Sequence, residues 1–146
     1  MFVVYKENKQ HFLRIVRSEN LVASVQKYCE TNKIHAGWIQ GLGACDRVII
    51  SYYNLEKKEY EKEELTEEFE LLSLVGNISL VDGKPFVHAH VTLGRRNKEV
   101  IGGHLHEMRI SGTGEVLITG FATEFARSKD EETGLSLLDG ENVDNS

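Results

Sequence analysis

The stretch Pro85-Phe86-Val87-His88-Ala89-His90-Val91-Thr92-Leu93 (residues 85–93) decides how this chain is expected to fold. Every second residue in it is apolar, and the residues between them include two histidines in a His-x-His pattern. Successive side chains of a strand point to opposite faces, so this alternation predicts a strand with one buried face. His88 and His90 would then lie together on the opposite face.

A second His-x-His, His104-Leu105-His106, follows directly after Gly102 and Gly103. The polar segment 94–98 between the two motifs has the composition of a hairpin turn. An antiparallel hairpin centred on Asn97 would set His90 across from His104 and His88 across from His106, all on one face. A pairing shifted by two positions would keep the four imidazoles together, whereas a shift by one would separate the two pairs.

Such a set of imidazoles predicts a metal site, with zinc or another transition metal such as copper, nickel or iron as the cofactor. Gly102 and Gly103 inside a strand mark a bulge or a place where a ligand or another backbone comes close. They could leave room beside His104 for an ion. Two other interpretations stay open: an exposed strand face that merely carries polar residues, and imidazoles that form hydrogen bonds across a subunit boundary.

Length and composition predict a single domain over residues 1–138 with a polar, frayed tail at 139–146. No basic segment with a long apolar run follows Met1, and no later segment has the length of a membrane span, so we expect a cytoplasmic protein with no membrane partner. Cys29 and Cys45 are expected to be buried or partly buried thiols rather than a disulfide.

The net charge of −6 argues against a surface that grips nucleic acid unaided. The acidic excess is concentrated in residues 127–146, so a basic patch elsewhere remains open, with Arg95, Arg96 and Lys98 as its candidates. A solvated turn is the favoured interpretation of these three residues.

The remaining pattern predicts many strands and one principal helix at about 18–32, which Ser18 would cap. Glycines at 41–43 and 112–114 are expected to form turns between separate strands, and residues 55–70 to form solvated edges and a connection. We therefore expect an α+β domain with a mainly antiparallel sheet. The expected strands are 2–5, 12–16, 36–42, 47–54, 70–80, 85–93 and 116–125.

An ordered set of motifs carries a resemblance to a known family. The motifs are Gly41-Leu42-Gly43-Ala44, residues 70–79, Asp82-Gly83-Lys84-Pro85, His88-Ala89-His90, Gly102-Gly103-His104-Leu105 and Glu115-Val116. In this order, over residues 3–138, they resemble the plants-and-prokaryotes-conserved (PPC) domain, also called DUF296.

The resemblance implies a mixed fold of α/β type on a mainly antiparallel sheet, with short flanking helices, assembled as a homotrimer. It also implies that His88, His90 and His104 are the family's histidine cluster, with His106 outside the pattern. In plants the domain accompanies AT-hooks, whose Arg-Gly-Arg-Pro core enters the DNA minor groove. This chain has a single proline, Pro85, and no such core. DNA therefore enters as a partner by family association only.

Two functions from different classes follow. The first is a PPC-like homotrimeric binding or regulatory module, DNA-associated in the family, whose histidines hold a metal or line a small-molecule pocket. The alternative is a zinc-dependent enzyme that acts on a small substrate through metal-activated water, with Glu115 or Glu124 as a base if either folds near the histidines. An assembly scaffold with empty histidines is the third possibility.

Overall fold

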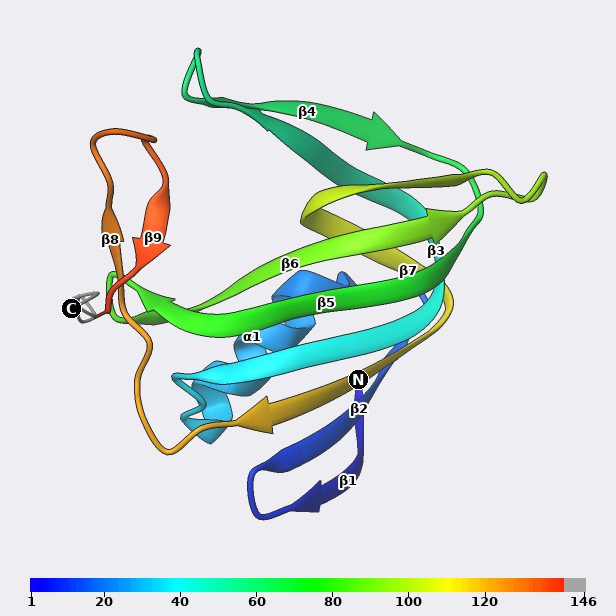
Figure 1. Cartoon of the computed structure of the whole chain (residues 1–146). Helices are drawn as coiled ribbons and strands as arrows, with labels where there is room; N and C mark the ends of the chain where they lie inside the picture. Colours follow the sequence, from blue (N-terminus) through cyan, green and yellow to red (C-terminus); the bar gives the residue numbers. More distant parts are fainter. Residues whose placement is uncertain (141–146) are drawn as a thin grey trace, which may run out of the picture.

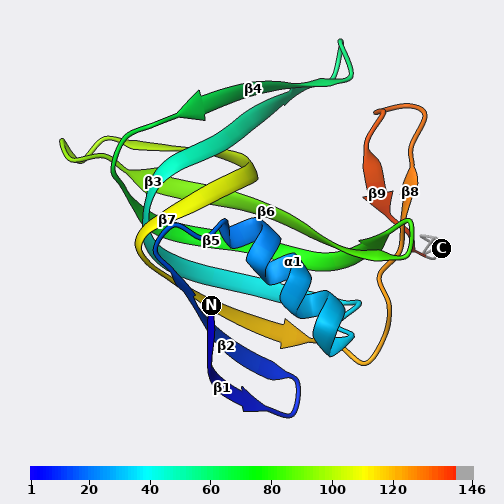
Figure 2. The same cartoon turned by 180° about the vertical axis from the view of Figure 1, so that it is seen from behind.

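The computed structural model describes residues 1–140, which form a seven-stranded antiparallel sheet, one helix and a separate two-stranded hairpin. Helix α1 lies across one face of the sheet, and the β8–β9 hairpin stands beyond the turn between β5 and β6 (Figures 1 and 2). In chain order the elements are β1 (Phe2–Glu7), β2 (Gln10–Val16), α1 (Leu21–Asn32), β3 (Gly37–Asn54), β4 (Glu59–Leu65), β5 (Phe69–Val81), β6 (Lys84–Gly94), β7 (Val100–Gly120), β8 (Arg127–Lys129) and β9 (Ser136–Leu138).

The expected α+β class is wrong, because the protein has a mainly-β fold. Strands make up 65% of the structure and the helix 9%. Within residues 1–140, α1 is the only helix, so the short flanking helices are absent from this part of the chain. The segments expected to be connections instead continue existing strands, and the acidic segment 55–70 supplies the edge strand β4. The strands expected at 2–5, 12–16, 70–80 and 85–93 are present as β1, β2, β5 and β6.

The two glycine segments expected to be turns are bends inside long strands. Strand β3 runs through Gly41 and Gly43 without ending, and β7 runs through Gly112 and Gly114. Gly43 pairs with Gly114, where a Cβ on Gly43 would lie 2.1 Å from the carbonyl oxygen of Thr113. Glycine is needed here because two backbones cross closely, which a pattern of residues along one strand does not reveal.

Strand β7 is shared between several neighbours. Its C-terminal part pairs with β2 and β3, and its first residues pair with β6. Because β6 pairs with β5, and β5 pairs with β3, the ladder β7-β6-β5-β3 closes on itself. Closure leaves fewer unpaired strand edges and fixes where β6 and β7 can separate.

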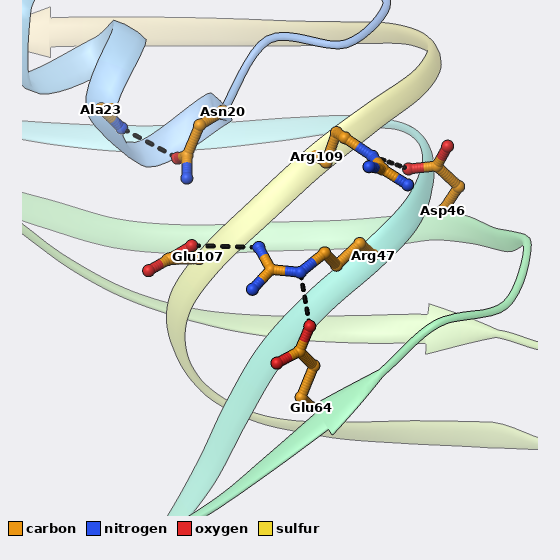
Figure 3. A network of polar contacts seen from close by, with 7 residues as sticks. All are labelled: Asn20, Ala23, Asp46, Arg47, Glu64, Glu107 and Arg109. Atoms are coloured by element: carbon orange, nitrogen blue, oxygen red, sulfur yellow. Dashed lines mark hydrogen bonds and ion pairs between the residues drawn. The ribbon is translucent and has the colours of Figure 1, made fainter.

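Ion pairs follow the outside of the bend in β3 and β7. Arg47 on β3 donates to Glu64 on β4 and to Glu107 on β7, while Arg109 on β7 donates to Asp46 on β3 (Figure 3). Exposed pairs of this kind each contribute little stability, about 0 to 1 kcal/mol. Their geometry nevertheless ties the three strands together beyond the glycine crossing.

The residue that caps helix α1 lies two positions later than expected. Asn20, rather than Ser18, accepts a hydrogen bond from the backbone N–H of Ala23 (Figure 3). Ser18 instead adopts a left-handed backbone with φ of 72°. The apolar side of the helix packs against β6 and β7. No helix in the described part of the chain is long and apolar enough to cross a membrane.

Both cysteines are free and buried, as expected. Burial raises the pKa of the Cys29 thiol to about 12, and burial together with the nearby Asp46 and Glu68 raises that of Cys45 to about 12. At neutral pH both thiols are therefore protonated and serve as core residues rather than nucleophiles. The expected tail at 139–146 lies, from residue 141 onward, outside the described residues.

Candidate metal and ligand site

His88, His90 and His104 come together on the face of β6 and β7 that points away from helix α1. One ring nitrogen from each lies within 4.8 Å of the others. The ring centroids of the three pairs are 5.2 to 5.4 Å apart. This triad could hold a metal ion, and imidazole is a ligand that suits transition metals.

The alternation of residues 85–93 explains the placement of the first two imidazoles. Val87, Ala89, Val91 and Leu93 are all buried, on the side covered by α1. His88 and His90 therefore project from the other face, as the sequence predicts. The turn before them is also as predicted, since Asp82 and Gly83 adopt positive φ angles of 50° and 72°, which a tight two-residue hairpin turn requires.

The predicted pairing across the second hairpin is confirmed at one position. His90 pairs with His104, and this is the last pair between β6 and β7. The two glycines before His104 mark a close backbone approach: a Cβ on Gly102 would lie 2.4 Å from the carbonyl oxygen of Val91, and one on Gly103 would lie 2.9 Å from that of Ser51. Their space is thus filled by neighbouring strands rather than by an ion.

The expected opposition of His88 and His106 does not occur. Beyond His104, strand β7 separates from β6 but stays paired with β3, which it already contacts at His104. The His106 side chain follows β3, where its Nε2 lies 2.7 Å from the hydroxyl of Ser51. His106 therefore contacts the edge of the His104 ring without joining the triad.

The surroundings keep two of the triad histidines neutral at pH 7. Burial, aided by the neighbouring histidines and Lys62, lowers the pKa of His104 to about 4. Burial, Arg127 and His90 lower that of His88. Metal ligation requires the neutral imidazole, so His88 and His104 are already in the binding form.

A cavity of about 260 Å³ opens beside the triad. His88, His104, Tyr60 and Phe86 line it from the sheet, and residues 134–137 line it from the β8–β9 hairpin. Tyr60 stacks on the His104 ring with centroids 4.7 Å apart and planes 28° apart. The hairpin is attached above it, since Tyr53 donates to the carbonyl of Thr133 and Lys58 to that of Glu131.

Arg127 also lines this cavity, although no pattern in the sequence indicated a role for it. Its Nη2 donates to Nδ1 of His88 at 3.2 Å. Because β8 lies 39 residues after His88, no local spacing connects the two. Only the fold brings Arg127 and Tyr60 to the histidines.

The other candidate residues lie elsewhere. Glu124 accepts from His35, and Glu115 lines a different cavity on the open sheet face. Neither belongs to the triad. In the basic turn, Arg95 pairs with Glu67 and Glu99, which neutralises part of its charge. Within residues 1–140 no carboxylate joins the histidine group.

The chain matches a known protein family over most of its length. The model of the Plants and Prokaryotes Conserved (PCC) domain matches residues 3–122. The chain belongs to the PCC domain family. This confirms the resemblance seen in the sequence. Among proteins with curated functions, none matches the chain significantly.

Several solved structures share the PCC fold. A protein of Archaeoglobus fulgidus described as metal-containing is 40% identical, with a TM-score of 0.86 over 96% of this chain and 99% of that one. A plant- and prokaryote-conserved protein of Pyrococcus horikoshii is 34% identical, with a TM-score of 0.86 over 98% and 100%. A candidate DNA-binding protein of Bacteroides thetaiotaomicron is 26% identical, with a TM-score of 0.89 over 92% and 94%.

Proposed function

We propose that this PCC domain is a metal-dependent binding or regulatory module in which His88, His90 and His104 hold zinc or another transition metal. The observation that carries the proposal is the convergence of three ring nitrogens within 4.8 Å. The description of the Archaeoglobus fulgidus protein as metal-containing supports it.

The spacing of the triad fits such an ion. Zinc–nitrogen bonds of about 2.0 to 2.1 Å place tetrahedral ligand nitrogens about 3.3 Å apart. The three nitrogens, which lie within 4.8 Å of one another, would have to move closer together to reach this spacing. Three protein ligands also leave a position for water or another small ligand.

One contact must open when a metal binds His88. A neutral imidazole has one lone pair, and Arg127 occupies the lone pair of Nδ1. If Nδ1 of His88 held the metal, Arg127 would lose its acceptor; if Nε2 held it, the ring proton would stand on Nδ1 and face the arginine donor. In both cases Arg127 releases His88.

Elemental analysis of the purified protein tests the proposal. We expect about one transition-metal ion per chain, or uptake of one zinc ion after chelation and reloading. A metal-free protein that takes up no zinc would overturn both the metal module and any metal-dependent reaction.

A zinc-dependent enzyme is the second candidate, favoured by the cavity beside the triad. A bound metal with an open position supplies Lewis-acid activation of a water or a carbonyl group. The chain's own residues would enclose the substrate and shield it from solvent. The lack of a carboxylate base in the triad, within residues 1–140, favours the binding module over the enzyme.

We also propose that the protein is a homotrimer associated through the sheet face opposite α1. Trp38, Leu42 and Val75 are 46%, 54% and 41% exposed on this face, where an apolar contact would cover them. Light scattering after gel filtration is expected to give three times the 16.5 kDa mass of one chain. A monomer would contradict the proposal.

DNA is the weaker partner proposal, supported by the candidate DNA-binding relative. Arg96 and Lys98 form no ion pair within residues 1–140 and are the cations that the β6–β7 turn offers. Two such charges supply little non-specific affinity. Retardation of duplex DNA at low ionic strength tests this role, and its absence would remove DNA as a direct partner.

A further inference from the structure

Arg127 carries a positive charge that the described residues do not balance. Its acceptors are the Ser79 hydroxyl, the Asn77 side-chain carbonyl, the backbone carbonyl of Ser136 and Nδ1 of His88, all neutral groups. No carboxylate of residues 1–140 forms an ion pair with it. A partly buried guanidinium without a counter-charge is costly, and a bound anion would relieve that cost.

The Arg127 side chain is partly buried. Desolvation lowers the pKa of the Arg127 guanidinium, although arginine stays protonated at any physiological pH. The charge therefore remains beside the cavity, partly removed from water. An anion that pairs with it there is screened less than it would be on an open surface.

The donors of Arg127 are not exhausted. A guanidinium has five N–H groups, and the four contacts above leave one of them unused. The contact with His88 is the longest of the four, and metal binding would free that donor as well. Two donors would then be available, which is the number that a carboxylate accepts from arginine in a bidentate pair.

The other walls select the kind of anion. The Phe86 ring lies beside the guanidinium of Arg127, with its centroid 5.8 Å from the guanidinium carbon Cζ. Leu135 and Leu137 line the cavity on the side of the β8–β9 hairpin. Apolar walls suit an aliphatic group better than the oxygens of a phosphate, which need several donors. At about 260 Å³ the cavity suits a small molecule.

We propose that this cavity binds a small organic carboxylate, whose charged end pairs with Arg127 beside the histidine triad and whose apolar end packs against Phe86 and the β8–β9 hairpin. The inference deepens the proposed function, because it names the ligand class of the same site. A metal on the triad adds a second positive charge facing the same space. Metal and carboxylate therefore bind cooperatively, each strengthening the other by the same factor.

Nuclear magnetic resonance titration with butyrate tests this inference. Butyramide serves as the neutral analogue and inorganic phosphate as the anion without an apolar end, both on metal-free protein. We expect butyrate to bind in the millimolar range and to shift the Arg127 Nε–H signal, with butyramide and phosphate at least tenfold weaker. Zinc loading is expected to strengthen butyrate binding by about tenfold. Equal binding of butyramide, or tighter binding of phosphate, would overturn the proposal.

Variants locate the site. Arg127→Gln is expected to weaken butyrate binding at least tenfold, whereas Arg96→Gln, on the exposed turn, leaves it unchanged. Because Arg127 also anchors the hairpin, Leu135→Trp is the second variant: it fills the cavity and keeps the arginine. We expect it to abolish butyrate binding, and wild-type affinity in either cavity variant would contradict the inference.

The two proposals fail separately. Zinc uptake without butyrate binding would leave the metal module standing and remove the carboxylate. Butyrate binding to a protein that takes up no zinc would support the carboxylate site and overturn the metal module.

Discussion

The two His-x-His motifs have the same spacing but contribute different numbers of histidines to the triad. Both histidines of the first motif, His88 and His90, join the triad, whereas the second contributes His104 alone. In the first motif one continuous β5–β6 ladder holds both residues. In the second, the pairing of β7 with β6 ends at His104 while its pairing with β3 continues, and His106 lies against Ser51 of β3. The motif therefore supplies imidazoles, and the strand pairing decides which of them lie close enough to hold the same metal ion.

The largest effect expected from this difference is on metal affinity. His104→Ala removes one of three converging nitrogens, and we expect its zinc dissociation constant to rise at least about 100-fold, since even partners outside the ligand set typically cost 10- to 100-fold. His106→Ala, the matched control in the same motif, is expected to change it less than about tenfold. Competition with a chromophoric chelator measures both constants. Equal losses in the two variants would return His106 to the ligand set.

The next largest effect is expected from a change in the β5–β6 pairing, which holds His88 and His90. A Cβ on Gly76 would lie 2.1 Å from the carbonyl oxygen of His88 and 2.7 Å from Cα of Ala89. Both are backbone atoms, so Gly76→Ala must push β5 away from β6. We expect a loss of about 3 kcal/mol in the free energy of unfolding, measured by urea denaturation, together with weaker zinc binding.

Gly112→Ala is the matched control for that change. Its added Cβ would meet only the Cβ of Ala44, at 3.7 Å, an ordinary contact. We expect its stability to stay within about 0.5 kcal/mol of the wild type. If Gly76→Ala were equally mild, tight strand contact could not be what positions His88.

The smallest effect is on pH dependence. The pKa of His104 falls from 6.5 to about 4 on folding, so below pH 6.5 the unfolded chain takes up a proton that the folded chain refuses. Stability is therefore full above about pH 6.5 and falls as the pH drops toward 4. For a half-buried ring we expect roughly 1 kcal/mol of this loss between pH 7 and pH 5.

Urea denaturation of the metal-free protein at pH 7 and pH 5 measures that loss. His104→Asn is expected to remove most of it. His106→Asn is expected to remove less, because the nearby Glu107 carboxylate opposes the lowering of the His106 pKa by burial and Lys62. A larger change in the His106 variant would contradict the assignment of the pH dependence to His104.

The sequence allowed the local parts of this site to be predicted. Alternation placed His88 and His90 on the face opposite Val87 and Val91, and the hairpin register correctly paired His90 with His104. Both inferences depend on neighbours along the chain or across one turn. The fold class was wrong because it depended on contacts between distant segments. Glycines where two long strands cross look the same in the sequence as glycines in turns, so two continuous strands were predicted as shorter strands with connections.

Contacts between distant segments could not be predicted. The crossing of Gly43 with Gly114 depends on how two long strands bend together. The arrival of Arg127 beside His88 depends on where β8 docks after the sheet has formed. Neither leaves a period or spacing in the sequence, since the contacting residues are far apart along the chain.

The position of the β8–β9 hairpin divides the site between two parts of the chain. The part that defines the family ends at residue 122, and it contains the whole histidine triad, whereas Arg127 and residues 134–137 follow it. A domain built in this way can exchange the β8–β9 hairpin without rebuilding its histidine triad. Grafting residues 123–140 from one family member onto another would then transfer ligand preference while the three histidines stay in place.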